Sequence, residues 1–297
     1  MATQLLSSSR SAASAPPNVR TNRPTRSVGD WLALIALFLL LLGMLSPFLL
    51  VALNAFKTQA DYSNYGPFSL PQAINLQNIV DYWNRVDFTN KLLNSTFISL
   101  SVAILAVIIS LLNGFALGIG KIKGRFFFLI FFMMVITIPN ESLAYPLYYF
   151  AKLLKIYDTQ FSVILIFTVL QSAFGTYLLS SLLSAFPKEL IEGAILDGCN
   201  KVQLLFRVVA PIIMPSLYVL FTFFFIWTWN EFFLPLIFLI SNNKQTVPIA
   251  IAINQGQYGM NVTVQSASAL LGILPCLVFF LLFQRTLTRG ITAGSIK

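Results

Sequence analysis

Long apolar runs alternate with short polar segments from residue 31 to residue 283. A membrane-spanning helix needs roughly 20 consecutive, mainly apolar residues. Six stretches meet this requirement, and we expect a transmembrane helix over each of residues 31–56, 92–117, 126–150, 161–183, 212–240 and 267–283. The pattern therefore predicts an all-α, polytopic membrane protein whose two termini lie on the same side.

Composition supports a membrane class and sets the outer boundaries. Apolar residues make up 57% of the chain and charged residues only 10%, which excludes an ordinary water-soluble domain. Residues 1–28 are rich in Ser, Ala, Pro and Arg, and we expect a disordered basic tail there, followed by a permease domain over 29–284 and a short tail over 285–297. The first apolar run begins too late and is too long for a cleaved signal peptide.

The placement of Lys and Arg predicts the orientation. If the N-terminus is cytoplasmic, most of the 19 basic residues fall in cytoplasmic segments. The opposite side keeps only Lys57, Arg85, Lys91, Lys152, Lys155 and Lys244. We therefore expect cytoplasmic termini, and the net charge of +9 then reflects topology and anionic lipid, with no need for nucleic acid.

The segment from residue 187 to 215 is a polar insertion between two apolar runs. Pro187 suits the start of a helix, Gly198 suits a left-handed residue that ends one, and Asn200 with Gln203 resembles a capping box. We expect two short helices that meet at Gly198. Ile191, Ala194 and Ile195 should share one face of the first helix, and Glu189 and Glu192 should lie on another, which suits either a docking element or an ordinary amphipathic surface helix.

Within this segment, Glu192, Ala194, Asp197 and Gly198 follow the EAA-loop pattern, continued by Phe206, Pro211 and Pro215. The pattern resembles that of ABC importer permeases, with Gly193 where that family usually has alanine. The resemblance implies that residues 185–207 dock on a cytoplasmic ATPase subunit through Glu189, Glu192, Ala194, Asp197 and Gly198, with Glu192 facing a basic partner residue. Gly193 should soften the helix by about 1 kcal/mol relative to alanine.

Further stretches resemble the carbohydrate-type permeases, in particular the type represented by the smaller permease of the maltose importer. They include Asn94 and Ser95, and residues 138–150, 227–236 and 284–297. The resemblance implies a type I permease fold in a bacterial inner membrane. Its partners would be a second permease subunit, two ATPase subunits that bind ATP and Mg²⁺, and an extracytoplasmic sugar-binding protein.

Two apolar runs carry polar groups that suggest a substrate path. Glu141 lies between Pro139 and Pro146, and an ionised side chain inside a bilayer costs roughly 3 kcal/mol, so it should face protein or water. Two roles for Glu141 are open: it lines the substrate path, or it is a purely structural carboxylate. In the fifth run, Asn230 and Glu231 precede Pro235, and we expect a break there.

Trp227 and Trp229 are candidates for stacking on a sugar ring, although interfacial anchoring explains them equally well. In the outer segment over 241–265, Asn254, Gln255, Gln257 and Tyr258 suit contact with the binding protein. The alternative is that this segment only connects two helices. The other outer segment, over 57–91, contains little that requires a fold of its own.

Catalytic and metal chemistry find no support in the sequence. It has no histidine and no C-x-x-C, and the Gly120-Lys121 pair lacks the first glycine and the hydroxyl residue of a phosphate-binding loop. We therefore expect no enzyme activity, no metal site and no cofactor bound by this chain. A rival hypothesis is a proton-coupled secondary transporter that uses Glu141 and Glu231; a structural membrane scaffold is a weaker third.

Overall fold

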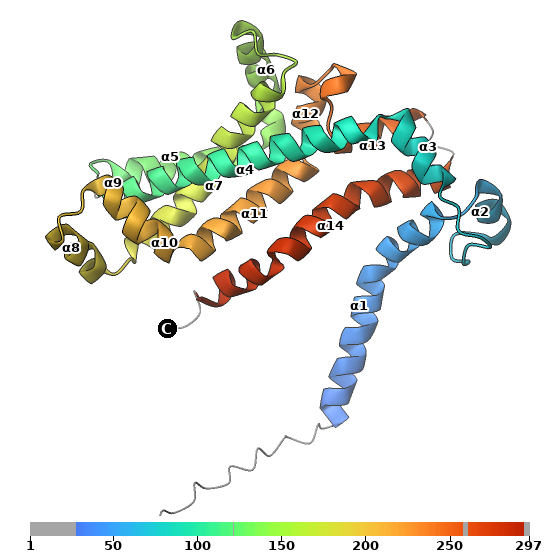
Figure 1. The fold of residues 1–297 in the computed structure, drawn as a ribbon, viewed down its shortest axis with the longest axis horizontal. Coiled ribbons are helices and arrows are strands. Elements are labelled where there is room, and N and C mark those ends of the chain that lie inside the picture. Colours follow the sequence, from blue (N-terminus) through green and yellow to red (C-terminus); the bar gives the residue numbers. More distant parts are fainter. Residues whose placement is uncertain (1–27, 121, 258–260, 294–297) are drawn as a thin grey trace, which may run out of the picture. The chain divides into compact units, whose positions relative to one another are not determined.

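The computed structural model describes the backbone of residues 28–120, 122–257 and 261–293, and the side chains within these ranges except at 257 and beyond 284. The described residues form helices and connecting segments, without a β-strand among them (Figure 1). The longer helices are α1 (Val28–Ala55), α4 (Phe88–Gly118), α5 (Arg125–Thr137), α7 (Gln160–Ser184), α11 (Met214–Asn230), α13 (Val247–Gln257) and α14 (Val262–Ala293). Shorter helices are α2 (Gln59–Tyr65), α3 (Gln77–Arg85), η1 (Asn140–Leu143), α6 (Ala144–Leu153), α8 (Lys188–Leu196), α9 (Lys201–Gln203), η2 (Leu204–Val209), α10 (Ala210–Ile212), α12 (Phe233–Phe238) and η3 (Asn242–Lys244).

The chain divides into two units, Met1–Pro47 and Phe48–Lys297. The described part of the first unit is the N-terminal portion of α1, and Pro47 lies where the second unit begins. This portion is apolar on all sides, which is typical of a helix surrounded by lipid or by other membrane helices. The second unit contains all the other elements.

Four helices are long and apolar enough to cross a membrane, and two bent pairs raise the number to six if each pair is one span. The straight ones are α1, α4, α7 and the part of α14 up to Gln284. One bent pair joins Arg125–Thr137 to Asn140–Leu153 at 96°, and the other joins Lys201–Ile212 to Met214–Asn230 at 79°. The first pair covers the third predicted span, 126–150. The second pair differs from the fifth predicted span, 212–240, because α11 ends at Asn230 and the other half of the pair, Lys201–Ile212, begins inside the polar insertion.

Proline residues explain both bends. Pro139 forces the preceding Ile138 into an extended conformation (ψ 123°), which ends α5. Pro211 and Pro215 lie in the first turns of α10 and α11, where proline is tolerated, so two helices begin close together on either side of Ile213. The break predicted at Asn230 and Glu231 is also present, because α11 ends at Asn230 and Glu231 is extended (ψ 128°).

The two central helices, α4 and α7, run parallel and in close contact. A Cβ placed on Gly114 would lie 2.7 Å from the Cβ of Leu179, and one on Gly118 would lie 2.6 Å from that of Leu183. Both pairs advance by one helical turn in the same direction. Glycines four residues apart let two membrane helices approach this closely, which is the small-x-x-x-small arrangement.

The N-terminal ends of α4 and α7 meet polar connecting segments, including the one that contains η3, whereas α8 and α9 lie at the other end of α4 (Figure 1). The segment over 57–91, predicted to lack a fold of its own, contains α2 and α3 and buries Tyr82 completely. That prediction was wrong, because Lys57 organises the segment: its buried ammonium donates to Asn54 Oδ1 and to the carbonyl groups of Gly66 and Pro67.

The segment over 241–265 is also more ordered than a loop. It contains η3, α13 and the first turn of α14, and Val247, Ile249 and Ala250 are buried. The apolar residues from Val247 to Ile253 were too few to suggest a membrane span, but they suffice for a helix that packs against α4 and α14. At the other end of α14, the helix continues past Gln284 to Ala293.

Candidate functional site

The polar insertion forms a helix-turn-helix at one end of the bundle. Pro187 precedes α8, and Gly198 ends it in the left-handed conformation (φ +80°). The Cys199 N–H donates to the Ala194 carbonyl group and the Gly198 N–H to that of Ile195, which satisfies two carbonyl groups at the helix end. The left-handed glycine is therefore confirmed.

The second helix begins with the capping box that the sequence predicts. The Asn200 side chain accepts from the Gln203 N–H at 2.9 Å, and the Gln203 side chain accepts from the Asn200 N–H at 2.9 Å. These reciprocal bonds fix the chain direction directly after Gly198. The turn between α8 and α9 is thus specified by three residues.

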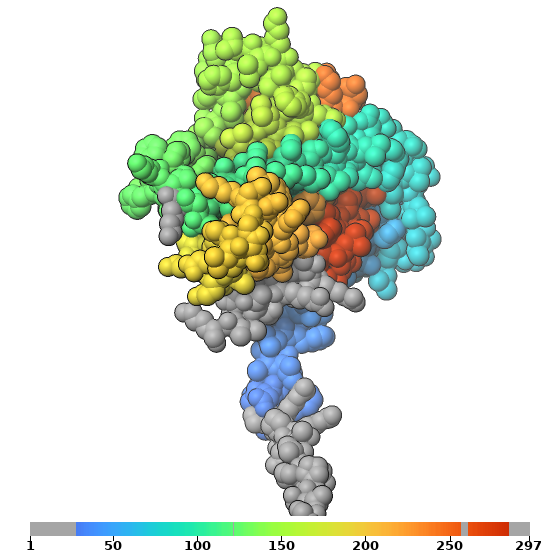
Figure 2. Space-filling view, turned by 60° about the vertical axis from the view of Figure 1, so that its left-hand side comes forward, coloured from blue at the N-terminus to red at the C-terminus, as the bar shows by residue number. Residues whose placement is uncertain are grey.

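The surface of this element exposes acidic and apolar side chains together. Glu189, Glu192 and Asp197 are exposed, while Ala194 is 8% exposed and joins the main core. Large apolar side chains stand in solvent beside the acids: Leu190, Ile195, Leu196, Val202 and Phe206. Figure 2 shows this part of the chain, in yellow and gold, facing the viewer.

The apolar face of α8 is only partly buried. Ala194 is buried and Ile191 half-buried, whereas Ile195 is 58% exposed. The first helix has only nine residues and contacts the rest of the unit mainly through Ala194 and the half-buried Ile191. An exposed mixture of carboxylates and aliphatic side chains on a short, well-capped helix is suited to docking on a partner that offers a basic, apolar groove.

A π-helix connects this surface element to the membrane. η2 follows α9 directly, and its end is marked by the Ala210 N–H donating to the Leu205 carbonyl group, five residues back. Leu204, Leu205 and Val209 anchor it in the core. Single π turns occur often at functional sites, but they carry no reliable sequence signal, so the sequence did not predict this one.

Two chain breaks meet inside the apolar part of the bundle. η1, which holds Glu141, packs against α12, which follows Glu231. Glu141 is exposed, whereas Glu231 is half-buried. We call the space beside them the break chamber: it is a cavity of ≈ 310 Å³ lined by Asn140, Phe167, Leu170, Gln171, Ile226, Trp227, Asn230 and Glu231.

The two tryptophans predicted as a pair lie in different surroundings. Trp227 is 43% exposed, lines the break chamber and contacts the rings of Phe174 and Phe223. Trp229 is 3% exposed and stacks on Phe225. Trp227 is therefore placed to meet a ligand, whereas most of the Trp229 ring is committed to packing.

The chamber also contains two polar residues that the sequence analysis missed. Gln171 of α7 donates through Nε2 to the Thr228 hydroxyl at 2.8 Å, and Asn140 begins η1. Gln171 is a lone amide in the middle of a 25-residue apolar helix. Its position in an otherwise apolar run was the signal that could have revealed it.

A second cavity of ≈ 630 Å³ lies between α11, α13 and α14 and shares Ile226 and Asn230 with the break chamber. Gln255 lines it, together with Trp229 and Cys276. Asn254, on the same helix as Gln255, is 1% exposed, and among the described residues neither polar atom of its side chain has a hydrogen-bond partner. The side chain of Gln257 and all of Tyr258 lie outside the described residues.

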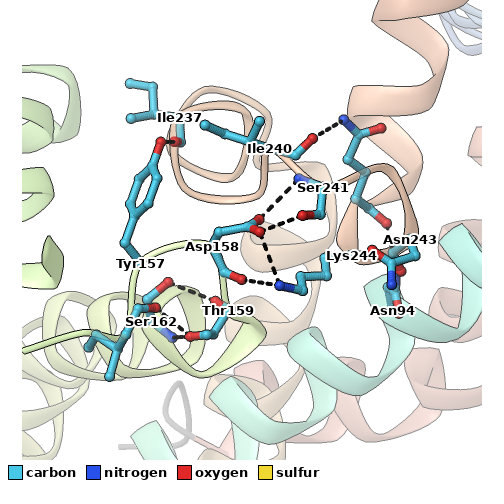
Figure 3. A network of polar contacts seen from close by, with 12 residues as sticks. Asn94, Tyr157, Asp158, Thr159, Ser162, Ile237, Ile240, Ser241, Asn243 and Lys244 are labelled. Carbon is cyan, nitrogen blue, oxygen red and sulfur yellow. Dashed lines mark hydrogen bonds and ion pairs between the residues drawn. The ribbon is translucent and has the colours of Figure 1, made fainter.

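At the end of the bundle opposite α8, polar side chains join neighbouring connecting segments to one another (Figure 3). The Asp158 carboxylate accepts from the Ser241 N–H and hydroxyl and forms an ion pair with Lys244 at 3.0 Å. Burial alone would raise the pKa of Asp158, but the two Ser241 hydrogen bonds and the Lys244 ammonium outweigh it and lower the pKa to about 2. Three of the six basic residues predicted outside, Lys57, Lys91 and Lys244, thus bind outer loops.

Asn94 extends this network to both central helices. Its Nδ2 donates to the carbonyl groups of Asn243 and Gln245, and its Oδ1 accepts from Gln160 at the start of α7. The neighbouring Ser95 hydroxyl accepts from the Val247 N–H. The Asn94-Ser95 pair therefore fixes the loop that leads into α13.

Together, the kinked spans, the intramembrane chamber and the capped surface element define a polytopic helical permease. The family of binding-protein-dependent transport system inner membrane components matches residues 111–292, which is more than half of the chain. The chain belongs to this family of multi-pass inner-membrane transport proteins, and the resemblance to ABC importer permeases is confirmed. The family does not fit the rival hypothesis of a proton-coupled carrier.

Similar proteins cover nearly the whole chain. The sulfoquinovosyl glycerol transport system permease protein SmoH of Agrobacterium fabrum is 30% identical over 91% of this chain and 94% of its own length. The arabinooligosaccharides transport system permease protein AraQ of Halalkalibacterium halodurans is 28% identical over 93% of this chain and 99% of its own length. A crystal structure of a bacterial ABC transporter that imports the acidic polysaccharide alginate has a chain with the same fold (TM-score 0.75, 20% identity, 88% of this chain and 99% of that chain).

Proposed function

We propose that this chain is one of two permease subunits of an ATP-driven importer that takes up a carbohydrate. The relatives named for transport of sulfoquinovosyl glycerol and of arabinooligosaccharides support a sugar-containing substrate. A second permease completes the translocation path, two ATPase subunits bind ATP and Mg²⁺, and an extracytoplasmic binding protein delivers the sugar. This chain itself binds no nucleotide and catalyses no reaction.

One observation carries the proposal: the α8–Gly198–α9 element exposes carboxylates and aliphatic side chains at one end of the bundle, opposite the polar outer network. We assign that end to the cytoplasm, because Lys123, Arg125, Lys188, Lys201 and Arg207 lie in the segments around it. The N- and C-termini are then cytoplasmic as well. Residues 185–207 couple this subunit to the ATPase, with Glu192 facing a basic residue of the partner.

The mechanism is alternating access. Nucleotide binding draws the ATPase subunits together, the docked α8 moves with them, and the spans rock between inward-facing and outward-facing arrangements. The break chamber, lined by Trp227, Asn230 and Glu231 and adjoining η1, which holds Glu141, forms part of the path. Trp227 offers an aromatic face to a sugar ring, and Gln255 lines the adjoining cavity toward the side where the binding protein delivers its ligand.

The deciding experiment is purification of the tagged chain from its native membrane in mild detergent. We expect an ATPase subunit and a second permease to accompany it, and hydrolysis of ATP to increase when a sugar-loaded binding protein is added. A chain that purifies alone and transports with a proton gradient would overturn the proposal and favour Glu141 and Glu231 as proton carriers.

A further inference from the structure

A row of exposed side chains begins at Glu141 and continues along α6. The pieces η1 and α6 together form the second half of a bent span, Asn140–Leu153. Side chains four residues apart are neighbours on the surface of a helix. Glu141, Tyr145, Tyr149 and Leu153 follow this spacing, and all four are exposed. We call these four residues the α6 row.

The other face of α6 already packs against the rest of the subunit. Leu147 and Tyr148 contact the buried cluster that contains Ala151 and Phe238. The Tyr148 ring also meets the Tyr157 ring edge-on, with the ring centroids 4.9 Å apart. Because this face holds α6 on the bundle, the α6 row is not needed for the fold and is available to another occupant.

The row begins before the chain has crossed the membrane. The 13 residues of α5 rise about 20 Å, whereas the apolar core of a bilayer is about 30 Å thick. The chain then bends by 96° between α5 and Asn140–Leu153, and Figure 1 shows α6 turned away from α4 and α7. If α5 crosses the membrane, Glu141 therefore lies within the depth of the apolar core and α6 runs along the membrane plane.

Neither lipid nor water alone suits the whole row. An ionised carboxylate facing lipid is costly, and in the part of the chain that the structure describes no ion pair holds Glu141. Water would suit this carboxylate, but it would leave the Leu153 side chain and the rings of Tyr145 and Tyr149 unburied. A protein surface that is apolar and carries one donor satisfies all four residues, and tyrosine is common at the centre of protein interfaces.

We propose that the second permease subunit packs on the α6 row and presents a basic side chain or another hydrogen-bond donor to Glu141. The inference rests on the proposed function and deepens it, since it names the surface on which this partner binds. Only a partner embedded in the membrane reaches a row at this depth, which excludes the ATPase subunits and the binding protein. The partner surface is apolar where it meets Tyr145 and Tyr149.

Photocrosslinking in the purified complex, held in lipid nanodiscs, identifies the occupant directly. A p-benzoylphenylalanine is introduced at Tyr145 or at Tyr149, and the adducts are identified by mass spectrometry. We expect adducts with the second permease at both positions. The matched control is Tyr148 on the packed face of the same helix, which should crosslink only within the chain. Adducts with lipid or with the binding protein, or no adduct at either position, would overturn the proposal.

Substitutions at Glu141 test the chemistry of the partner. Glu141→Leu should lower the midpoint temperature at which the two permeases separate, because it leaves the partner's donor buried without an acceptor. Glu141→Gln should lower this midpoint less, since its amide oxygen still accepts a hydrogen bond. A midpoint that rises in Glu141→Leu would show that no donor faces this position and would overturn that part of the proposal.

A charge placed in the row tests the surface itself. Tyr149→Arg should reduce the second permease recovered with the tagged chain about tenfold. The same change at Phe68, which is 78% exposed in the segment over 57–91, should leave the recovery unchanged. Full recovery with Tyr149→Arg would overturn the proposed surface. A wild-type chain that purifies without a second permease would overturn the proposed function, whereas a permease that accompanies it but crosslinks at neither tyrosine would overturn only this inference.

Discussion

At the scale of single residues, the α8–Gly198–α9 element owes its shape to a few positions with specific backbone demands. Gly198 adopts φ +80°, and the Asn200–Gln203 pair closes the capping box. Both were predictable because turn and cap chemistry is local in sequence. The exposure of Ile195 and the hydrogen bond of Gln171 to Thr228 were not, since each depends on contacts between segments distant along the chain.

Glu192 is the residue through which we expect coupling to be lost most selectively. Glu192→Lys places a positive charge where the proposed ATPase groove is basic, so like charges oppose docking. We expect the complex to assemble and hydrolyse ATP while sugar uptake falls at least about tenfold, corresponding to about 1.4 kcal/mol. Asp81→Lys makes the same charge change at the opposite end and should transport normally. Wild-type uptake by Glu192→Lys would contradict the coupling role.

Gly193 and Gly198 should respond oppositely to alanine. A Cβ at either position meets nothing within 4 Å, so packing does not distinguish them. Gly193 is helical, and alanine there should stabilise α8 by about 1 kcal/mol. Gly198 is left-handed, and alanine there should cost about 1–2 kcal/mol. Amide hydrogen exchange across α8 measures the change in helix stability for both variants. Slower exchange in Gly198→Ala than in wild type would show that alanine is not strained at this turn.

At the scale of elements, the apolar pattern located the membrane spans but not their irregularities. Prolines indicated the bend near Pro139 and the break after Asn230, because proline acts on its immediate neighbours. The helical character of residues 247–257 and the fold of 57–91 were missed. Both rest on long-range contacts, such as that of the Asn78 side chain with the Ala55 and Lys57 carbonyl groups.

The α4–α7 contact should tolerate no added side chain on its glycines. Gly118→Ala brings a Cβ within 2.6 Å of the Leu183 Cβ and 3.2 Å of the Ser180 carbonyl oxygen, so the helices must separate. Overpacking of this kind costs about 1–3 kcal/mol. The midpoint of thermal inactivation of the purified complex should fall. Gly43→Ala, where a Cβ meets nothing within 4 Å, is the control and should not lower the midpoint.

The contacts of Ser241 and Lys244 with the Asp158 carboxylate should weaken only in strong acid. The pKa of this carboxyl is lowered to about 2 in the folded chain, below the ordinary value of about 3.9. A lowered pKa means that the carboxylate contributes its full stability above the ordinary pKa and loses it as the pH falls from about 4 through 2. The protection of the Ser241 amide against hydrogen exchange, relative to the intrinsic rate at each pH, should fall across this range in wild type. Asp158→Asn should exchange faster at neutral pH and show no such transition.

At the scale of the whole molecule, the two ends of the bundle differ in their basic residues and polar networks. Lys123 and Lys155 are both exposed and lie at opposite ends of the spanning elements. In a background with Cys199→Ser, a membrane-impermeant thiol reagent should label Lys123→Cys only in inside-out vesicles and Lys155→Cys only in right-side-out vesicles. The reverse pattern would invert the proposed topology and remove α8 from the ATPase side.

The close, parallel seating of α4 and α7 gives the subunit stiffness. A helix of 31 residues, the length of α4, spans about 46 Å. The glycine contacts hold the two helices at one end, and the Asn94–Gln160 bond holds them at the other. Such a pair bends little. A force on α8, which follows α7 after three residues, would therefore tilt both helices together along their whole length. Under the proposed coupling of α8 to an ATPase subunit, one rotation of this pair would open one side and shut the other, without a separate gate on each.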